Sequence, residues 1–162
     1  MKESFKYYNP TRIYFGEGSI CHLSEELKKV GKRILLVYGM GSIHRNGIYD
    51  QVISILREAG KEVFELSGVK SNPSYSSVLE GKAIVEKEKI DFILACGGGS
   101  VIDCSKAIAA AAFEEDPWEK YYKRQEDLTH SVTPIGTVLT MVGTGSEMNS
   151  GSVITNEEEK LK

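Results

Sequence analysis

The chain has 162 residues, of which 41% are hydrophobic and 27% charged, and its formal net charge at neutral pH is −3. This length and composition predict one globular domain with a substantial core. Basic and acidic residues are interspersed, as on solvated helix faces, so the sequence excludes the clustered basic surface of a nucleic-acid-binding protein.

No segment has the pattern of a membrane span or an export signal. The apolar stretch Ile90–Phe113 contains charged residues and three consecutive glycines, which do not suit a bilayer. The first five residues lack the apolar core of a signal peptide. The three cysteines, Cys21, Cys96 and Cys104, form no CxxC pair, and an odd count indicates free thiols in a reducing compartment. We therefore expect a cytoplasmic protein with no membrane partner.

The first half of the chain predicts strands that alternate with helices. In chain order we expect a short N-terminal edge strand or hairpin over 11–15, a helix over 19–30, a buried strand over 33–38, a glycine loop over 39–42, a helix over 47–59 and a strand over 62–66.

The second half continues this alternation. We expect a loop over 72–74, a helix with a capping box at 77–80 that runs to 87, a buried strand over 91–96, a glycine turn over 97–99, a helix from 100 to about 112, a helix start at 116–119, a strand over 132–139, a glycine-rich loop over 143–147 and a strand over 153–155. The continuous apolar strands predict an α/β fold, with a mostly parallel sheet and helices on both faces. The charged tail 156–162 has no domain-closing element, which is typical of a segment of a larger protein.

The strongest chemical signal is the sequence DFILACGGGSVIDCSKAIA from Asp91 to Ala109. It predicts a buried strand that runs through Gly97, Gly98 and Gly99 into a helix. The backbone N–H groups at a helix start bind phosphate oxygens, and glycine lets a ligand approach the backbone closely. The alternative is a tight turn with Ser100 and Asp103 as a simple capping box.

Two further glycine loops follow predicted strands. The hydroxyls and glycines from Thr140 through Thr144 to Glu147 could wrap the same ligand from the other side, or form a flexible surface loop. The loop Gly39-Met40-Gly41-Ser42 lacks the acid that often holds the adenosine ribose in nicotinamide sites. A 2′-phosphate would meet no repulsion there, and Ser42 could bond to it. The alternative is an ordinary glycine turn.

Other candidate motifs do not support a catalytic or metal site within this chain. The sequence Gly16-Glu17-Gly18-Ser19 resembles a phosphate loop, but its position favours a hairpin turn. His22, His44 and His130 have no metal-ligand spacing with one another or with the cysteines. Cys96 and Cys104 are expected to be core thiols, and no Ser-His-Asp arrangement is found. We therefore predict no metal ligand and no catalytic residue here.

With these loops placed, the sequence resembles the iron-containing alcohol dehydrogenase family. Its opening, YNPTRIYFG from Tyr8, is similar to that family's first strand and turn. The sequence GGGSVIDCSKAIA from Gly97 matches its glycine signature, GGGSxxDxAK. The stretch LTMVGTGSEMNSGSVIT from Leu139 resembles its second signature, PTTAGTGSE. The departures Leu139, Met141 and Val142, together with Gly151 and Ser152, resemble the butanol-dehydrogenase-like branch, for which the resemblance implies NADPH.

The resemblance implies that residues 1–162 form a Rossmann-like dinucleotide-binding domain. It places the pyrophosphate and nicotinamide side near the glycine turn, and Thr140 and Thr144 along the cofactor. Lys162 matches a lysine that touches the cofactor in relatives. The full set of expected cofactor-binding residues is Gly39, Gly41, Ser42, Asn72, Gly97, Gly98, Gly99, Ser100, Asp103, Thr140, Thr144 and Lys162.

The resemblance also implies a C-terminal helical domain, absent from this chain, in which an aspartate and three histidines hold Fe²⁺ or Zn²⁺. The whole protein would then transfer hydride between a nicotinamide dinucleotide, with NADP(H) preferred over NAD(H), and a small alcohol or aldehyde. This chain alone would be inactive, and its exposed interdomain face could promote a homo-oligomer. The alternative is a stand-alone nucleotide-binding module without catalytic activity.

Overall fold

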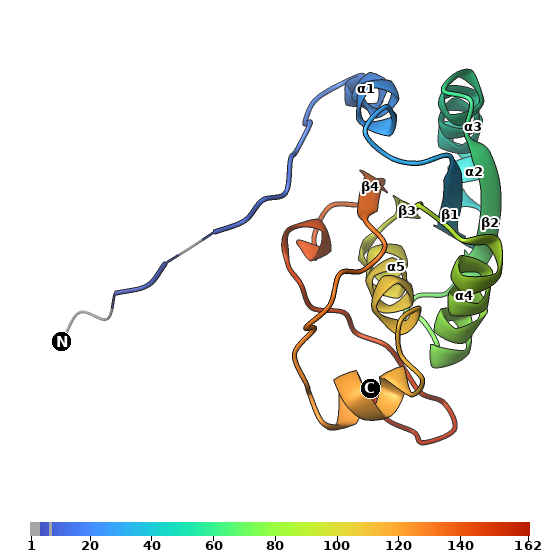
Figure 1. Cartoon of the computed structure of the whole chain (residues 1–162). Helices are drawn as coiled ribbons and strands as arrows, with labels where there is room; N and C mark the ends of the chain where they lie inside the picture. Colours follow the sequence, from blue (N-terminus) through green and yellow to red (C-terminus); the bar gives the residue numbers. More distant parts are fainter. Residues whose placement is uncertain (1–3, 7) are drawn as a thin grey trace.

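The computed structural model describes residues 4–6 and 8–162, and these form one four-stranded parallel sheet with strand order β2-β1-β3-β4 (Figure 1). The strands are β1 (Arg33–Gly39), β2 (Glu62–Val69), β3 (Phe92–Gly97) and β4 (Ile135–Leu139). The expected parallel α/β class is confirmed.

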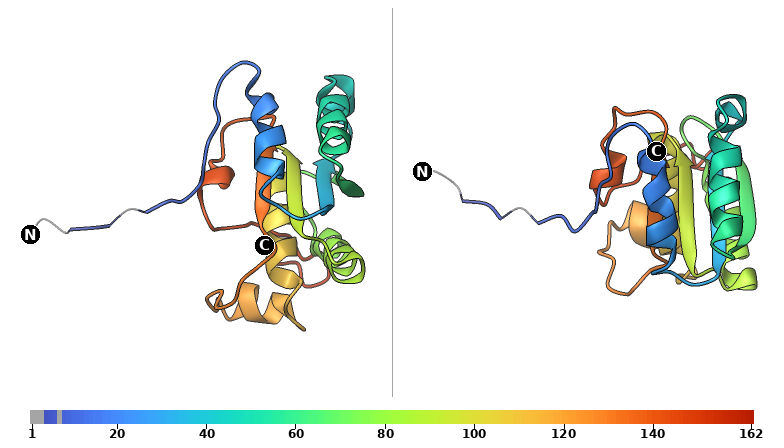
Figure 2. Two further views of the ribbon diagram at one scale, coloured as in Figure 1. Left: turned by 45° about the horizontal axis from the view of Figure 1, so that its top comes forward. Right: turned by 90° about the horizontal axis from the view of Figure 1, so that it is seen from above.

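Helices cover both faces of the sheet (Figure 2). The α-helices are α1 (Leu23–Leu27), α2 (Ser42–Arg45), α3 (Ile48–Glu58), α4 (Tyr75–Glu88) and α5 (Gly99–Ala111). The other helical segments are η1 (Ser19–His22), η2 (Trp118–Lys123) and η3 (Ser146–Met148). The N-terminal helix expected over 19–30 therefore begins as a 3₁₀ turn and ends at Leu27.

Side chains from alternate positions of the strands build two hydrophobic layers. In β1, Leu35 and Val37 join the layer under α4 and α5, while Ile34 and Leu36 join the layer under α1, α2 and α3. Both sets are fully buried. Strands buried on both faces must be apolar at every position, which is why the two middle strands were recognisable in the sequence.

The expected N-terminal edge strand or hairpin is wrong. Residues 11–15 lie in the described part of the chain and carry no strand. A strand needs a neighbouring backbone to complete its hydrogen bonds, and the sheet ends at β2 and β4. The segment is instead tied to α1 by side chains: Arg12 forms an ion pair with Glu26 at 2.8 Å, and Tyr14 donates to the same carboxylate at 2.6 Å.

The expected strand over 153–155 is reduced to one backbone bridge. Thr155 pairs with Ser74 in parallel, through Tyr75 N to Thr155 O at 2.8 Å and Thr155 N to Pro73 O at 2.9 Å. This bridge brings the last part of the chain beside the loop that follows β2. It therefore positions residues that are far apart in the sequence.

The N-terminal cap of α4 also differs from the expected capping box at 77–80. The cap is Ser74, whose side chain accepts a hydrogen bond from Ser77 N at 3.3 Å. The helix thus begins at Tyr75, earlier than Ser77. Ser74 has the extended backbone that a cap requires, with φ −83° and ψ 151°.

This assignment gives a stability prediction. We expect Ser74→Ala to lower the free energy of unfolding by about 1 kcal/mol, because the first turn of α4 loses its cap. Ser77→Ala is the matched control and should have a smaller effect, since it keeps the backbone N–H that donates to Ser74 Oγ and removes only the contact between the two hydroxyls at 2.9 Å. Urea unfolding of both variants measures the difference. A larger loss in Ser77→Ala would contradict the assignment of the cap to Ser74.

Candidate functional site

The predicted site residues gather at the carboxyl ends of the parallel strands. Gly39 ends β1, Gly97 ends β3 and Leu139 ends β4. From β1 the chain moves outward to β2, and then returns to place β3 on the other side of β1. This reversal is the topological switch point at which open α/β sheets bind ligands. It lies between the ends of β1 and β3, where the sequence places two glycine loops.

The three glycines at the junction of β3 and α5 differ in what a side chain would meet. A Cβ on Gly97 would lie 2.5 Å from Val101 Cγ2, and one on Gly99 would lie 2.3 Å from Thr144 Oγ1. Both are therefore explained by packing within the chain. A Cβ on Gly98 would meet only Met141, at 3.4 Å, and its φ of −90° suits any residue. Internal packing therefore gives no reason for a glycine at 98, whereas a ligand over the turn would.

Helix α5 begins directly after this turn, with Gly98 as its N-cap. The first N–H groups of a helix have no intrahelical acceptor, and no side chain in the described structure caps them. No acidic residue occupies the first turn. A 13-residue helix with an uncapped, acid-free start after a glycine turn has the geometry of an anion site.

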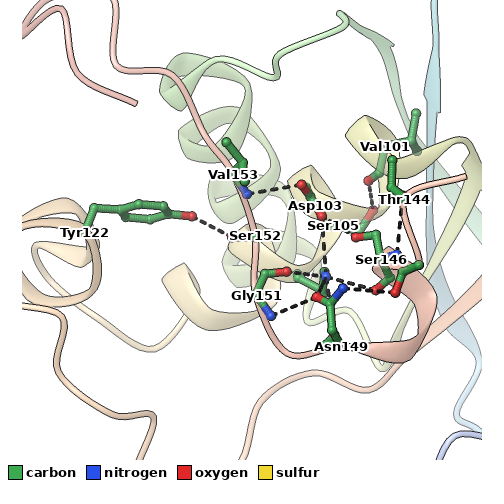
Figure 3. A network of polar contacts seen from close by, with 12 residues as sticks. Val101, Asp103, Ser105, Tyr122, Thr144, Ser146, Asn149, Gly151, Ser152 and Val153 are labelled. Atoms are coloured by element: carbon green, nitrogen blue, oxygen red, sulfur yellow. Dashed lines mark hydrogen bonds and ion pairs between the residues drawn. The ribbon is translucent and has the colours of Figure 1, made fainter.

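The alternative capping box of Ser100 and Asp103 is absent from this helix start. Asp103 points instead to the loop that follows β4 (Figure 3). Its Oδ1 accepts a short hydrogen bond from Ser146 Oγ, and its Oδ2 accepts from Val153 N at 3.1 Å. Both carboxylate oxygens of Asp103 therefore accept hydrogen bonds from the protein. These two bonds fix the loop to α5.

The loop after β4 lies against the glycine turn. Thr140 N donates to Gly97 O at 3.0 Å, and Met141 lies against Gly98. Thr144 sits where a side chain on Gly99 would be, and its Oγ1 accepts from Ser146 N at 3.3 Å. The two glycine motifs, which begin at Gly97 and Gly143, thus form one surface.

The loop after β1 lies beside this surface. A Cβ on Gly39 would be 3.3 Å from Val69 O and 3.9 Å from Val101 Cγ2, so the end of β1 is close to the start of α5. Gly41 has a φ of 116°, which favours glycine, and Ser42 begins the short helix α2. No acid stands at the end of β1.

The aromatic residues around this loop form a cluster on its far side. His44 lies 4.1 Å from the ring of Tyr49 and 5.5 Å from that of Tyr38, measured between ring centroids. The hydroxyls of Tyr38 and Tyr49 both donate to the Glu65 carboxylate, and the Tyr38 bond is 2.7 Å long. Burial raises the pKa of Tyr38 to about 12. His44 thus packs against these rings while it remains exposed.

Asn72 and Lys162, the remaining predicted residues, meet each other. Lys162 Nζ donates to Asn72 Oδ1 at 2.6 Å. Asn72 follows β2 with a φ of 59°, and the Ser74–Thr155 bridge brings the two segments together. The predicted residues therefore lie at the carboxyl ends of β1 and β3, in the first turns of α5, and in the segments that follow β1, β2 and β4.

Two residues of this region were missed in the sequence. Lys106 donates to Ser146 O at 2.9 Å, and Asn149 Nδ2 donates to Gly145 O at 2.9 Å. Lys106 stands one helical turn after Asp103, so an ion pair on one face of α5 was foreseeable from the spacing. Its loop partners were not, because they lie at least 40 residues away.

The three histidines occur in separate environments. His22 stacks on Tyr14, His44 lies in the aromatic cluster, and His130 Nε2 is 2.8 Å from Glu114 Oε1. The described residues contain no group of three or more side chains that could hold a metal ion. They do not fit iron or zinc.

The environments of the cysteines agree with the expected core thiols. The described cysteines are unpaired, and burial raises the pKa of both Cys96 and Cys104 to about 12, as suits core thiols. No helix in the described part of the chain is long and apolar enough to cross a membrane.

A protein-family model described as iron-containing alcohol dehydrogenase matches residues 10–162. The chain is 55% identical over 161 residues to the probable NADH-dependent butanol dehydrogenase 1 of Bacillus subtilis, with 99% of this chain and 41% of the relative covered. It is 40% identical over 157 residues to the NADPH-dependent aldehyde reductase YqhD of Escherichia coli, with 95% and 40% covered.

Solved structures are similar over the same region. The crystal structure of NADH-dependent butanol dehydrogenase A from Thermotoga maritima superposes with a TM-score of 0.91 at 44% identity, covering 97% of this chain and 39% of that one. The chain therefore spans about 40% of the length of these relatives.

Proposed function

We propose, because this chain belongs to the iron-containing alcohol dehydrogenase family, that residues 1–162 form the dinucleotide-binding domain of a nicotinamide-dependent alcohol dehydrogenase. The observation that carries the proposal is Gly98, the one glycine of the turn that packing within the chain does not explain. A phosphate placed at the start of α5 would occupy the space that a side chain at position 98 fills.

The residues of this chain would bind and orient the cofactor. The uncapped N–H groups of α5 would receive the pyrophosphate, and Thr140 and Thr144 would lie along it. Gly41 and Ser42 would face the adenosine ribose, with Asn72 and Lys162 at the neighbouring loop. A bound nicotinamide supplies the hydride carrier.

We place the substrate and metal chemistry in the remainder of the whole protein. The described residues do not fit a metal, so no step of the reaction is assigned to iron or zinc here. The proposed substrate is a small alcohol or aldehyde, and the proposed location is the cytoplasm. This chain by itself would bind the dinucleotide without turning over substrate.

Calorimetric titration of the purified chain with NADPH and NADH tests the binding proposal. We expect saturable binding of one dinucleotide per chain, with ADP-ribose competing and adenosine competing weakly, because the phosphates contact the helix start. Weak affinity is expected, because we propose that the rest of the whole protein adds contacts to the cofactor. Absence of saturable binding by either dinucleotide would refute the proposal.

We further propose a preference for NADP(H). The relatives' names divide between NADH and NADPH, so the preference rests on the loop after β1. Gly39 and the following residues present no carboxylate to repel a 2′-phosphate, and Ser42 offers a hydroxyl donor. We expect NADP(H) to bind about tenfold more tightly than NAD(H), or roughly 1.4 kcal/mol.

Gly39→Asp should reverse this preference, because the new carboxylate repels the phosphate and bonds to the bare ribose hydroxyls. A Cβ at this position lies 3.3 Å from Val69 O, so the backbone must adjust slightly. Gly39→Asn is the matched control, since it adds the same bulk without the charge. Titration of both variants with both cofactors measures the preference. Equal effects of Asp and Asn would show that charge at this position does not select the cofactor.

A further inference from the structure

The ammonium group of Lys106 lies among five oxygen atoms. Its Nζ is 2.9 Å from Ser146 O, 3.4 Å from Asn149 O, 3.2 Å from Asn149 Oδ1 and 3.4 Å from Asp103 Oδ1, and it donates a short bond to Gly151 O. An ammonium has three N–H donors. Five oxygens around one cation therefore resemble a coordination shell more than a set of individual hydrogen bonds.

Most of these oxygens belong to one loop. The backbone carbonyls of Ser146, Asn149 and Gly151 all turn toward the same point, although they are separated by only a few residues. Figure 3 shows these three residues converging beside Asp103. Carbonyl dipoles that converge repel one another unless a positive charge lies between them. The shape of this loop therefore depends on the cation at its centre.

The position of Lys106 is costly for a lysine. Its side chain is 15% exposed, and burial lowers the pKa of Lys106, while Asp103 and Glu147 oppose that change. A lysine placed for solubility would keep its ammonium in water. The loop oxygens instead replace the water that Lys106 loses.

The loop held in this way is the one that closes the candidate site. Ser146 connects the two regions: its carbonyl accepts from Lys106, and its N–H donates to Thr144 Oγ1. Thr144 lies against Gly99 at the start of α5. Asp103 binds the donors of the loop, at Ser146 Oγ and Val153 N, and Lys106 binds its acceptors.

We propose that Lys106 is a positioning residue whose ammonium acts as a tethered monovalent cation, filling a five-oxygen site and holding loop 144–153 over the glycine turn. Removal of the side chain leaves a site of matching charge and size for a free ammonium ion. The effect on cofactor affinity rests on the proposed function. The order of the loop does not depend on it.

The test compares Lys106→Ala with Lys82→Ala. Lys82 is a close control because its side chain, at 16% exposed, is buried to the same degree as that of Lys106. Its ammonium donates to only one backbone carbonyl, Glu114 O, and lies 3.7 Å from Glu86 Oε1. Hydrogen–deuterium exchange of the amides in 144–153 reports loop order, and NADPH titration reports affinity. Both are measured in sodium chloride and in ammonium chloride at equal ionic strength.

We expect Lys106→Ala to speed exchange across 144–153 and to weaken NADPH binding about tenfold, the scale of one hydrogen bond to a charged group. Ammonium chloride should restore both properties, and tetramethylammonium, which has no N–H donor, should restore neither. Lys82→Ala should leave this loop unchanged in every salt. Unchanged exchange in Lys106→Ala, or a loss that ammonium does not reverse, would overturn the proposal.

Two further measurements keep the test decisive. If Lys106→Ala does not fold, Lys106→Gln retains the length of the side chain without its charge, and a loop as protected as in the wild type would overturn the proposal. If the wild-type chain binds no dinucleotide, the proposed function fails, while exchange in 144–153 still decides the role of Lys106.

Discussion

Replacement of Gly98 by valine is expected to weaken dinucleotide binding by about a hundredfold or more while the chain stays folded. The backbone of Gly98 is extended, with φ −90° and ψ −169°, so no left-handed conformation requires glycine there. The nearest atom to a new Cβ is Met141 Cβ at 3.4 Å. The fold therefore tolerates the side chain, but a phosphate at the start of α5 cannot.

The neighbouring glycines provide the contrast. Gly97→Val and Gly99→Val should lower the free energy of unfolding as well as affinity, because their side chains would overlap Val101 and Thr144. Gly98→Ala should give an intermediate loss of affinity with wild-type stability. Calorimetry and urea unfolding of the four variants separate the two effects. Unchanged affinity in Gly98→Val would show that the turn is purely structural.

Replacement of Gly81 by valine is expected to cost about 2–3 kcal/mol of stability through overpacking. Gly81 is buried where α4 packs on α5. A Cβ there would lie 2.3 Å from Ile108 Cδ1 and 2.6 Å from Ile108 Cγ1, and Ile108 is itself fully buried. The isoleucine thus fills the space that the glycine leaves open.

A double-mutant cycle isolates this contact. Ile108→Ala alone should cost about 2–5 kcal/mol because it leaves a cavity. Combining it with Gly81→Val should cost less than the sum of the two single changes, by about 1–2 kcal/mol, since the valine fills part of that cavity. Leu79→Val, at an exposed position of α4, is the control and should be nearly neutral. Strict additivity would contradict the proposed packing.

The middle strands and the glycine turn could be predicted from sequence because their signals are local. A strand buried on both faces must be apolar throughout, as β1 and β3 are, and a helix that follows three glycines marks a close backbone approach. The parallel sheet follows from the alternation of strands and helices. The expected grouping of the site loops follows in turn, because parallel strands end at one edge.

Other features depended on partners that are distant in sequence. The segment 11–15 has the alternation of a strand, but no sheet edge lies beside it, so side-chain bonds to α1 decide its course. Ser77 has the sequence context of a cap. The Ser74–Thr155 bridge and the Ser74 side chain nevertheless place the N-cap of α4 three residues earlier, at Ser74.

The roles of the motif residues were also set by tertiary structure. Sequence placed Asp103 at a helix start and gave Lys106 no role, while the fold brings a loop from some 40 residues away against both. Which glycine is required by packing and which is left for a ligand was equally invisible in the motif. That distinction depends on Val101 and Thr144. Local patterns fix backbone geometry, whereas the partner of a buried charge or a missing Cβ is decided only when distant segments meet.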